Sequence, residues 1–257
     1  MKNYPTNQER TAEYLENFNR EKTLKFLLNE EHPIIFDVGA NIGTSLDEFK
    51  EWWPNSQVHC FEPQEECWSS LDKKALKYNH AYINKYAVGN NHNQLSTFYS
   101  HDISSGISGF NKVNLNSQDS LYLNKIKNSK SESLELYEDS LNHERKIKIN
   151  RLDEYIKSKK IDKINLLKID TQGYEPEVIE GFGIDISKVD VVITELMFYD
   201  YYERSLSFFD IERFLIPAGF RLYDINHIAK NPMNGRTDWV DVIYVNERER
   251  GAKNAEK

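Results

Sequence analysis

One stretch of the chain decides its fold: Ile34-Ile35-Phe36-Asp37-Val38-Gly39-Ala40-Asn41-Ile42-Gly43-Thr44-Ser45. The apolar run at its start ends in an acid, and this pattern predicts a strand that is buried on both faces of a parallel sheet. Gly39 and Gly43 then allow a sharp turn that a ligand can approach without meeting a Cβ atom. Because Thr44 and Ser45 begin the helix that follows, its free N–H groups point into the crevice above the strand. The stretch therefore predicts a site that could hold an adenosyl cofactor.

A second signal for a nucleoside site is Glu62, which follows the strand predicted at residues 57–61. It stands about 20 residues beyond the first glycine of the turn, where a carboxylate accepts hydrogen bonds from both hydroxyls of a ribose. Pro63 stops the strand and fixes the turn after it. Taken alone, Glu62 could be a solvated acid at a strand end, and the glycines could merely shape a turn. Their order and spacing together favour nucleoside binding.

Length and charge limit the classes of protein that this chain can represent. The 257 residues are enough for one α/β core, and we expect a single domain over residues 1–257. Within it we expect a helical lead at residues 1–32 and a polar insertion or lid at residues 101–145. The net charge of −8 argues against nucleic acid as a partner, because nucleic-acid binding depends on a basic face.

The sequence also bears on compartment and assembly. It contains neither an apolar run of 18 residues nor a signal peptide, so we expect no transmembrane segment and a soluble, cytoplasmic protein. Cys60 falls in a predicted buried strand and Cys67 on the next helix, and both are expected to be core thiols. The N-terminal lead is expected to pack on the sheet edge, but it could instead cover the cofactor or form a dimer contact. A homo-oligomer therefore stays open.

Elements further along the chain alternate as a parallel α/β sheet requires. Strands are expected at residues 81–88, 164–170, 189–196, 220–224 and 240–245, with an alternating strand at 94–99 and an edge strand at 146–149. Helices are expected at residues 65–78, 151–156 and 207–215, and another after Pro176. Residues 101–145 show no lasting period, as in a mobile segment or a functional lid. Within them, residues 104–109 could border the cofactor pocket or form a plain loop.

Four motifs follow one another along the chain: Phe36-Asp37-Val38-Gly39-Ala40-Asn41-Ile42-Gly43, Phe61-Glu62-Pro63, Leu152-Asp153-Glu154-Tyr155 and Leu167-Lys168-Ile169-Asp170-Thr171-Gln172-Gly173-Tyr174-Glu175. In this order they resemble the FkbM-type S-adenosylmethionine-dependent methyltransferases. The resemblance covers residues 34–196 and depends on the combined order more than on any one motif. Many members carry Val-Glu where this chain has Thr171-Gln172, so a role that needs an acid there does not carry over. The insertion before Lys146 is longer and more polar than the resemblance leads us to expect.

The resemblance implies a class I methyltransferase fold, which is α/β and Rossmann-like. Its mostly parallel, seven-stranded sheet would have the order 3-2-1-4-5-7-6, with helices on both faces and the last strand antiparallel. The implied cofactor is S-adenosylmethionine: Asp37 would hold its methionine end, the glycine turn would pass beneath it, Glu62 would bind its ribose and residues 86–88 would border its adenine. The residues implied for cofactor binding are Asp37, Gly39, Ala40, Asn41, Gly43, Thr44, Ser45, Glu62, Pro63 and Ala87.

Methyl transfer to oxygen needs a general base or a divalent cation beside the methyl group, because alcohols are poor nucleophiles. Asp170, which ends a predicted strand, is the first candidate, with Glu195 as its partner. Alternatively, Asp170 accepts N–H bonds from the Gly173 loop and Glu195 merely ends a strand. By analogy with the macrocin-type sugar O-methyltransferases, a divalent cation such as Mg²⁺ bound by these oxygens stays open.

Two further groups of residues could contribute to the reaction. His227, after the sixth strand, and His101, at the edge of the insertion, each offer a second base or are solvated loop histidines. The aromatic cluster at residues 198–204 is expected over the mouth of the cleft, where tyrosine faces and an arginine fork suit a sugar ring and its phosphate. Packing around a helix start is the alternative for this cluster. The residues expected to bind the acceptor are Tyr199, Tyr201, Tyr202 and Arg204.

The sequence therefore predicts an S-adenosylmethionine-dependent O-methyltransferase for a sugar hydroxyl of a nucleotide-linked or surface-polysaccharide precursor. The family supplies this acceptor, and no residue identifies it. An N-methyltransferase or a methyltransferase of another small metabolite is the first alternative. An oxidoreductase of the NAD type would also use Glu62, but the spacing from Gly39 to Gly43 differs from the glycine pattern that binds pyrophosphate. A non-catalytic binding protein with the same fold is the third alternative.

Overall fold

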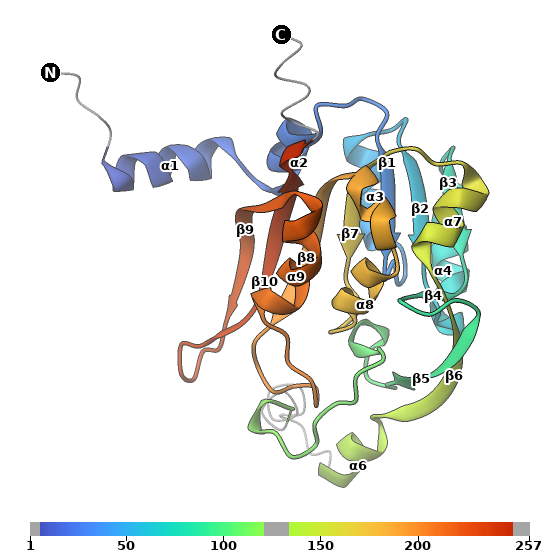
Figure 1. Cartoon of the computed structure of the whole chain (residues 1–257). Coiled ribbons are helices and arrows are strands. Elements are labelled where there is room, and N and C mark those ends of the chain that lie inside the picture. The colour runs from blue at the N-terminus through green and yellow to red at the C-terminus, as the bar shows by residue number, and fades with distance from the viewer. Residues whose placement is uncertain (1–5, 121–133, 249–257) are drawn as a thin grey trace, which may run out of the picture.

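The computed structural model describes residues 6–120 and 134–248 (Figure 1). Parts of the predicted N-terminal lead, residues 1–5, and of the predicted insertion, residues 121–133, therefore lie outside the described residues. Within the described ranges, none of the helices combines the length and the apolar character that a membrane span requires.

A seven-stranded sheet forms the centre of the fold, and it confirms the predicted fold class. Its order is β3 (Ala81–Asn84), β2 (Gln57–Phe61), β1 (Ile34–Val38), β7 (Ile164–Ile169), β8 (Val189–Met197), β10 (Thr237–Asn246) and β9 (Phe220–Lys230). When only the strands of this sheet are numbered, that order is 3-2-1-4-5-7-6. The central pairs are parallel, and β10 is antiparallel to both of its neighbours. The carboxyl ends of β1, β2, β7 and β8 therefore meet at one edge of the sheet.

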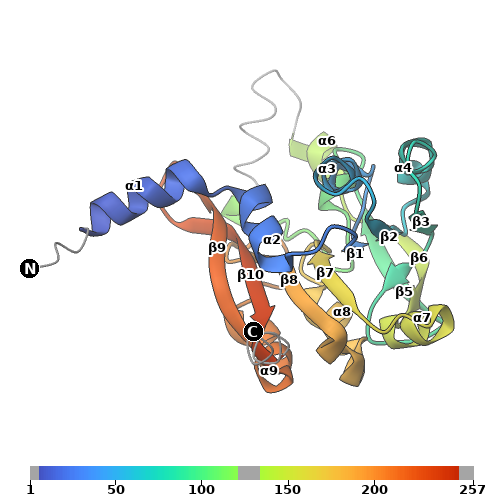
Figure 2. The same ribbon diagram turned by 90° about the horizontal axis from the view of Figure 1, so that it is seen from above.

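Helices cover both faces of this sheet, as seen from above in Figure 2. One face packs against α2 (Arg20–Leu28), α3 (Thr44–Trp52) and α4 (Glu65–Ala75), and the other against α7 (Leu152–Lys159), α8 (Glu175–Glu180), η2 (Gly183–Lys188) and α9 (Phe208–Ala218). Apolar side chains recur on the helices at the spacing that faces a core, which explains why these segments are helical and amphipathic. Cys60 and Cys67 are free and buried, as predicted.

The N-terminal helix α1 (Asn7–Asn17) lies beside β9 and buries none of its residues (Figure 2). Its contact with the sheet includes a hydrogen bond of 3.3 Å from the Tyr14 hydroxyl to Asp224. Leu15 on this helix is 70% exposed. The helix is thus present where the sequence predicted one, and whether it forms a dimer contact stays a prediction.

A second sheet of three strands stands beside the first, in the order β4 (Ala87–Val88), β6 (His143–Asn150) and β5 (Gln94–Ser100). It joins the alternating strand and the edge strand that the sequence predicted separately. The segment between β5 and β6 contains η1 (Ser105–Ile107) and α6 (Leu134–Asp139). Val113, Tyr137 and Leu141 from this segment pack against Met197 and Tyr202, so its described part has a small apolar core of its own.

The two largest differences from the predicted strands are at residues 81–88 and 220–224. The strand predicted at residues 81–88 is two strands, β3 and β4, which belong to different sheets. The last hydrogen bond between the β2 segment and the β3 segment runs from the N–H group of Glu62 to the carbonyl of Asn84. Because Pro63 has no N–H group, the pairing ends there. The strand predicted at residues 220–224 continues to Lys230, because β10 pairs with it along its whole length. The second difference moves His227 from a loop into β9.

Candidate active site

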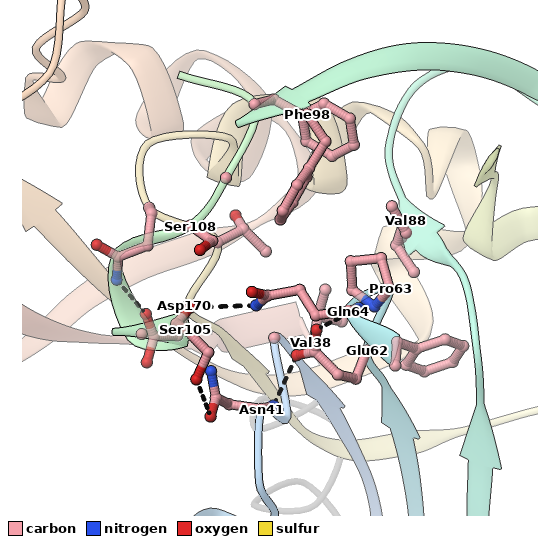
Figure 3. A pocket seen from close by; sticks show the side chains of 18 residues that line it. Val38, Asn41, Glu62, Pro63, Gln64, Val88, Phe98, Ser105, Ser108 and Asp170 are labelled. Carbon is pink, nitrogen blue, oxygen red and sulfur yellow. Dashed lines mark hydrogen bonds between the residues drawn. The ribbon is translucent and has the colours of Figure 1, made fainter. Parts of the chain in front are cut away.

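A cavity of about 100 Å³ lies at the carboxyl ends of β1, β2 and β7 (Figure 3). Apolar side chains form much of its wall, and a few polar groups converge on it. Its apolar lining includes Val38, Phe61, Pro63, Ala87, Val88, Phe98 and Phe110. Its polar lining includes Asn41, Glu62, Gln64, Ser105, Ser108, Asp170, Thr171 and Gln172. We call this space the donor crevice.

The glycine turn after β1 brings three strands together at the donor crevice. Gly39 has a φ of +80°, and a Cβ atom there would overlap the carbonyl oxygen of Asp170. The N–H groups of Gly39 and Ala40 both donate to the carbonyl of Phe61, at 3.0 and 3.1 Å. The turn is therefore held against the ends of β2 and β7, and only glycine allows this approach.

Glu62 is held firmly at the wall of the crevice. Its two carboxylate oxygens accept hydrogen bonds from the backbone N–H groups of Asn41 and Gln64, at 2.7 and 2.8 Å. The side chain is only 2% exposed, and burial raises its pKa to about 7 in spite of these bonds. Each oxygen keeps a further lone pair for a hydroxyl donor.

Asp37 is completely buried, and its charge is balanced by Lys168. The Nζ atom of Lys168 lies 3.1 Å from Asp37, 3.5 Å from Asp170 and 3.2 Å from the carbonyl of Gly39, to which it donates. Burial alone would lower the pKa of Lys168, but the two carboxylates outweigh it and hold the pKa above its ordinary value. One buried ammonium group thus fixes the first acid, the glycine turn and Asp170 relative to one another.

A short segment after β5 closes over the donor crevice. The Ser105 hydroxyl donates to the Asn41 side chain at 3.1 Å, and the Gln64 amide donates to the Ser105 carbonyl at 3.1 Å (Figure 3). Gly109 pairs with Tyr99 of β5 through two backbone hydrogen bonds, of 2.8 and 3.1 Å. Most of residues 104–109 therefore line the crevice, which was one of the two alternatives predicted for this segment.

A second cavity, of about 360 Å³, lies next to the donor crevice. Its wall comes from β8, from the β9–β10 hairpin and from the segment after β5. It is lined by Ile107, Asp119, Gln172, Glu195, Met197, Tyr199, Lys230, Asn231, Pro232, Asp238 and Trp239. Gln172 lines both spaces. We call this second space the acceptor cavity.

Gln172 forms the boundary between the two spaces. Its Nε2 atom donates to Asp170 at 2.9 Å, and its Oε1 atom accepts a hydrogen bond from the Tyr202 hydroxyl at 2.9 Å. Its φ of +56° turns the chain between β7 and α8. An uncharged amide thus holds Asp170 at the point where the donor crevice and the acceptor cavity meet.

Three carboxyl groups near this boundary have different surroundings. Asp170 is 41% exposed at its side chain and receives the Gln172 amide. Burial, followed by the nearby charges of Asp170, Glu175 and Asp241, raises the pKa of Glu195 to about 9. Glu175 is buried and accepts the N–H groups of Thr171 and Gly173, at 2.8 and 3.2 Å. The loop N–H bonds that an alternative assigned to Asp170 therefore go to Glu175.

Comparison with known proteins identifies the class. Residues 37–222 match the family model described as the methyltransferase FkbM domain. The chain belongs to the FkbM methyltransferase family. It is 23% identical over 180 residues to the 2-O-methyltransferase NoeI of Sinorhizobium fredii (strain NBRC 101917 / NGR234), which covers 70% of each chain.

A solved structure of methyltransferase FkbM from Methylobacillus flagellatus KT has a TM-score of 0.51 to this chain at 14% identity. The match covers 91% of this chain but 50% of that one, so this chain spans half the length of that relative. The shared fold and the family model confirm the resemblance that the sequence predicted. The protein is a methyltransferase, a class whose general methyl donor is S-adenosylmethionine.

Five of the ten residues predicted for cofactor binding line the donor crevice of this FkbM chain. These are Gly39, Asn41, Glu62, Pro63 and Ala87. The other five, Asp37, Ala40, Gly43, Thr44 and Ser45, do not line it. Sequence reasoning missed Gln64, Phe98 and Phe110, because nothing local to these residues marks them and only the second sheet and α4 bring them to the crevice.

Of the four residues predicted for the acceptor, only Tyr199 lines the acceptor cavity. Tyr201 is buried and stacks on Tyr199 at 5.7 Å between ring centroids. Tyr202 is buried, and its hydroxyl donates to Gln172. Arg204 forms an ion pair with Glu177 at 2.8 Å. The expectation that all four lie at a cleft mouth therefore fails for three of them. Two of these side chains are buried in the protein, and the third forms an ion pair.

The two predicted histidines lie away from both spaces. His227 is exposed on β9 opposite Asp241 and lines neither the donor crevice nor the acceptor cavity. His101 is buried and accepts the N–H group of Asn142 at 2.9 Å, and burial lowers its pKa to about 4. Among residues 6–120 and 134–248, no three His, Cys, Asp or Glu side chains are arranged to hold a metal ion.

Proposed function

We propose that the protein transfers a methyl group from S-adenosylmethionine to a sugar hydroxyl, on a nucleotide-linked or surface-polysaccharide precursor. The observation that carries this proposal is that Gln172 lines both spaces, with Asp170 on the donor side and Glu195 on the acceptor side. A crevice for a nucleoside and a cavity for a second molecule share one wall there, and a carboxylate stands at that wall. This is the arrangement that transfer between two bound molecules requires.

The donor crevice fits an adenosyl group. Glu62 keeps free lone pairs for the ribose hydroxyls, and the apolar wall of Val88, Phe98 and Phe110 suits a flat, apolar base. When bound, the cofactor supplies a methyl group on a positively charged sulfur. Asp37 and Lys168 would then act by positioning the glycine turn and Asp170, since Asp37 is fully buried.

Asp170 and Glu195 are suited to different parts in the reaction. The Lys168 ammonium group and the Gln172 amide stabilise the negative charge of Asp170, so Asp170 is the group that takes the hydroxyl proton. Glu195 keeps its proton near neutral pH because burial raises its pKa. It therefore acts as a neutral hydrogen-bonding group that orients the acceptor. A pair of acids in such different surroundings is a common catalytic pattern.

The lining of the acceptor cavity favours a sugar. Tyr199 and Trp239 present aromatic rings whose centroids are 5.9 Å apart, and Asn231 and Asp238 add polar groups. Sugars present apolar ring faces together with many hydroxyls, which this combination matches. The relative NoeI is named a 2-O-methyltransferase, which supports oxygen as the accepting atom.

A transfer assay tests this function. The protein is incubated with S-adenosylmethionine labelled in its methyl group and with a panel of hexoses, hexose phosphates and amines. The proposal expects label on a sugar oxygen, and transfer to amines alone would contradict it. A parallel reaction with a chelator tests the divalent cation, which stays a prediction: Asp170 and Glu195 would be its ligands, and loss of turnover that Mg²⁺ restores would support it.

A further inference from the structure

One cation on the wall of the acceptor cavity has no counter-ion among the described residues. The ionisable side chains in that wall include three acids, Asp119, Glu195 and Asp238, and one ammonium group, that of Lys230. The charge of each decides which acceptor the cavity can hold.

The acids are already engaged. Arg236 donates to Asp119 at 2.6 Å and to Asp238 at 2.9 Å, and Asp119 also accepts the N–H group of Asp200 at 2.8 Å. These contacts tie the segment after β5 to the β9–β10 hairpin. Glu195 is neutral near pH 7, because burial raises its pKa to about 9.

Lys230 is different. Its ammonium group donates to the Thr237 hydroxyl across the hairpin at 2.6 Å, and within the described part of the chain it forms no ion pair. Two of its three N–H groups remain for a ligand. Arg204, which the sequence pointed to for a phosphate, is paired with Glu177 and lies outside the cavity wall.

We propose that the acceptor is an anionic sugar, with its phosphate or carboxylate group bound by Lys230 and its ring against Trp239 and Tyr199. This deepens the proposed function and rests on it. A hydrogen bond from an ammonium group to an anion is about twice as strong as one between neutral groups, so an anionic substituent gains most at this position.

Three proteins test this assignment: the wild type, Lys230→Gln and Lys146→Gln. Lys146 is a matched control, because its ammonium group also donates to a threonine hydroxyl across two strands, that of Thr97 at 2.6 Å, but in the second sheet. Each protein is assayed for transfer to hexose 1-phosphates, hexuronic acids and neutral methyl hexosides. Binding of S-adenosylhomocysteine is measured by calorimetry in parallel.

We expect the wild type to prefer one anionic class, and Lys230→Gln to lower kcat/KM for that class by about tenfold or more. In Lys230→Gln, kcat/KM for neutral sugars and the affinity for S-adenosylhomocysteine should be unchanged. Lys146→Gln should match the wild type in all of these measurements. Higher salt should reduce kcat/KM for the anionic sugar in the wild type and much less in Lys230→Gln. The phosphate and uronate arms then identify which anion is bound.

Three outcomes would overturn the assignment. If neutral sugars are the better substrates, or if Lys230→Gln affects neutral and anionic sugars equally, the anionic acceptor is wrong while sugar methylation stands. If no sugar accepts label although S-adenosylhomocysteine binds, the proposed acceptor class fails as well.

Discussion

At the scale of single residues, the surroundings of Asp170 and Glu195 separate the roles that we propose for these two acids. Asp170 is partly exposed and lies beside an ammonium group and an amide, whereas Glu195 is half-buried and lies near other acids. The sequence identified both residues, because each stands at the end of a buried strand. It could not separate their roles. Asp241 reaches Glu195 only through the pairing of β8 with β10. Lys168 and Gln172 are close to Asp170 in the sequence, but their side-chain contacts with it are visible only in the folded chain.

The division of roles predicts opposite outcomes for two conservative substitutions. Asp170→Asn removes the proton acceptor and should lower kcat by about 100-fold or more. Glu195→Gln keeps the shape and the neutral charge of the protonated acid, so kcat should fall by less than about tenfold. Initial rates at saturating cofactor measure both. Equal losses in the two variants, or a larger loss in Glu195→Gln, would show that the assignment is reversed.

Glu195 should also make stability depend on pH. Its pKa is about 9 in the folded protein and 4.5 for a free carboxyl group. Between these values the folded protein binds a proton that the unfolded chain has released, so the free energy of unfolding falls as pH rises through this window. Glu195→Gln lacks this loss of stability. The difference between the Tm of Glu195→Gln and that of the wild type should therefore be about 3 °C or more larger at pH 9 than at pH 5.

Thermal unfolding at several pH values measures this gap. Glu62 and Glu175 have raised pKa values in both proteins, so their contributions cancel in the comparison. A constant gap between the wild type and Glu195→Gln would show that the carboxyl group is ionised throughout the range.

At the scale of elements, the strand, glycine turn and helix at residues 34–52 could be predicted, because apolar runs, glycines and caps are local signals. The boundaries of β4 and β9 could not be, because they depend on where a neighbouring strand ends. The same holds for residues 105–110, which border the donor crevice only because β5 pairs with β6 in a second sheet. Local sequence patterns therefore predicted the elements that depend on nearby residues, and not the boundaries that depend on a neighbouring strand.

The glycine turn gives a prediction at this scale. Gly39→Ala adds a Cβ atom that overlaps the carbonyl of Asp170, in a backbone conformation that alanine rarely adopts. It should cost more than about 2 kcal/mol of stability and abolish cofactor binding. Gly235→Ala is the control, since Gly235 also has a positive φ, +74°, but nothing lies within 4 Å of the added atom. Its cost should be only the backbone strain, about 1 kcal/mol.

Denaturant unfolding of the two alanine variants provides the comparison. A loss in Gly39→Ala no larger than that in Gly235→Ala would mean that the turn relaxes away from β7. The close packing of β1 against Asp170 would then be unnecessary for the fold.

At the scale of the whole molecule, the family resemblance implied the order of the large sheet, and the alternation of elements agreed with it. The acceptor cavity could not be predicted, because its wall joins residues as distant as Ile107, Glu195 and Trp239. The sequence pointed instead to the tyrosines after β8, of which only Tyr199 reaches the cavity. The sequence therefore identified candidate binding residues that follow the first strands. The residues of the acceptor cavity that come from the β9–β10 hairpin could be found only in the structure.

The central claim is that the ends of β1 and β2 bind an adenosyl group through Glu62. Calorimetric titration with S-adenosylhomocysteine tests it most directly, on the wild type, on Glu62→Ala and on Glu65→Gln, an exposed acid of α4 outside the crevice wall. We expect the wild type and Glu65→Gln each to bind one molecule of S-adenosylhomocysteine. Their affinity should be higher at pH 8 than at pH 6, because Glu62 has a pKa of about 7. Glu62→Ala should bind S-adenosylhomocysteine at least about tenfold more weakly. Absence of binding by the wild type, or equal affinity in Glu62→Ala, would contradict the central claim.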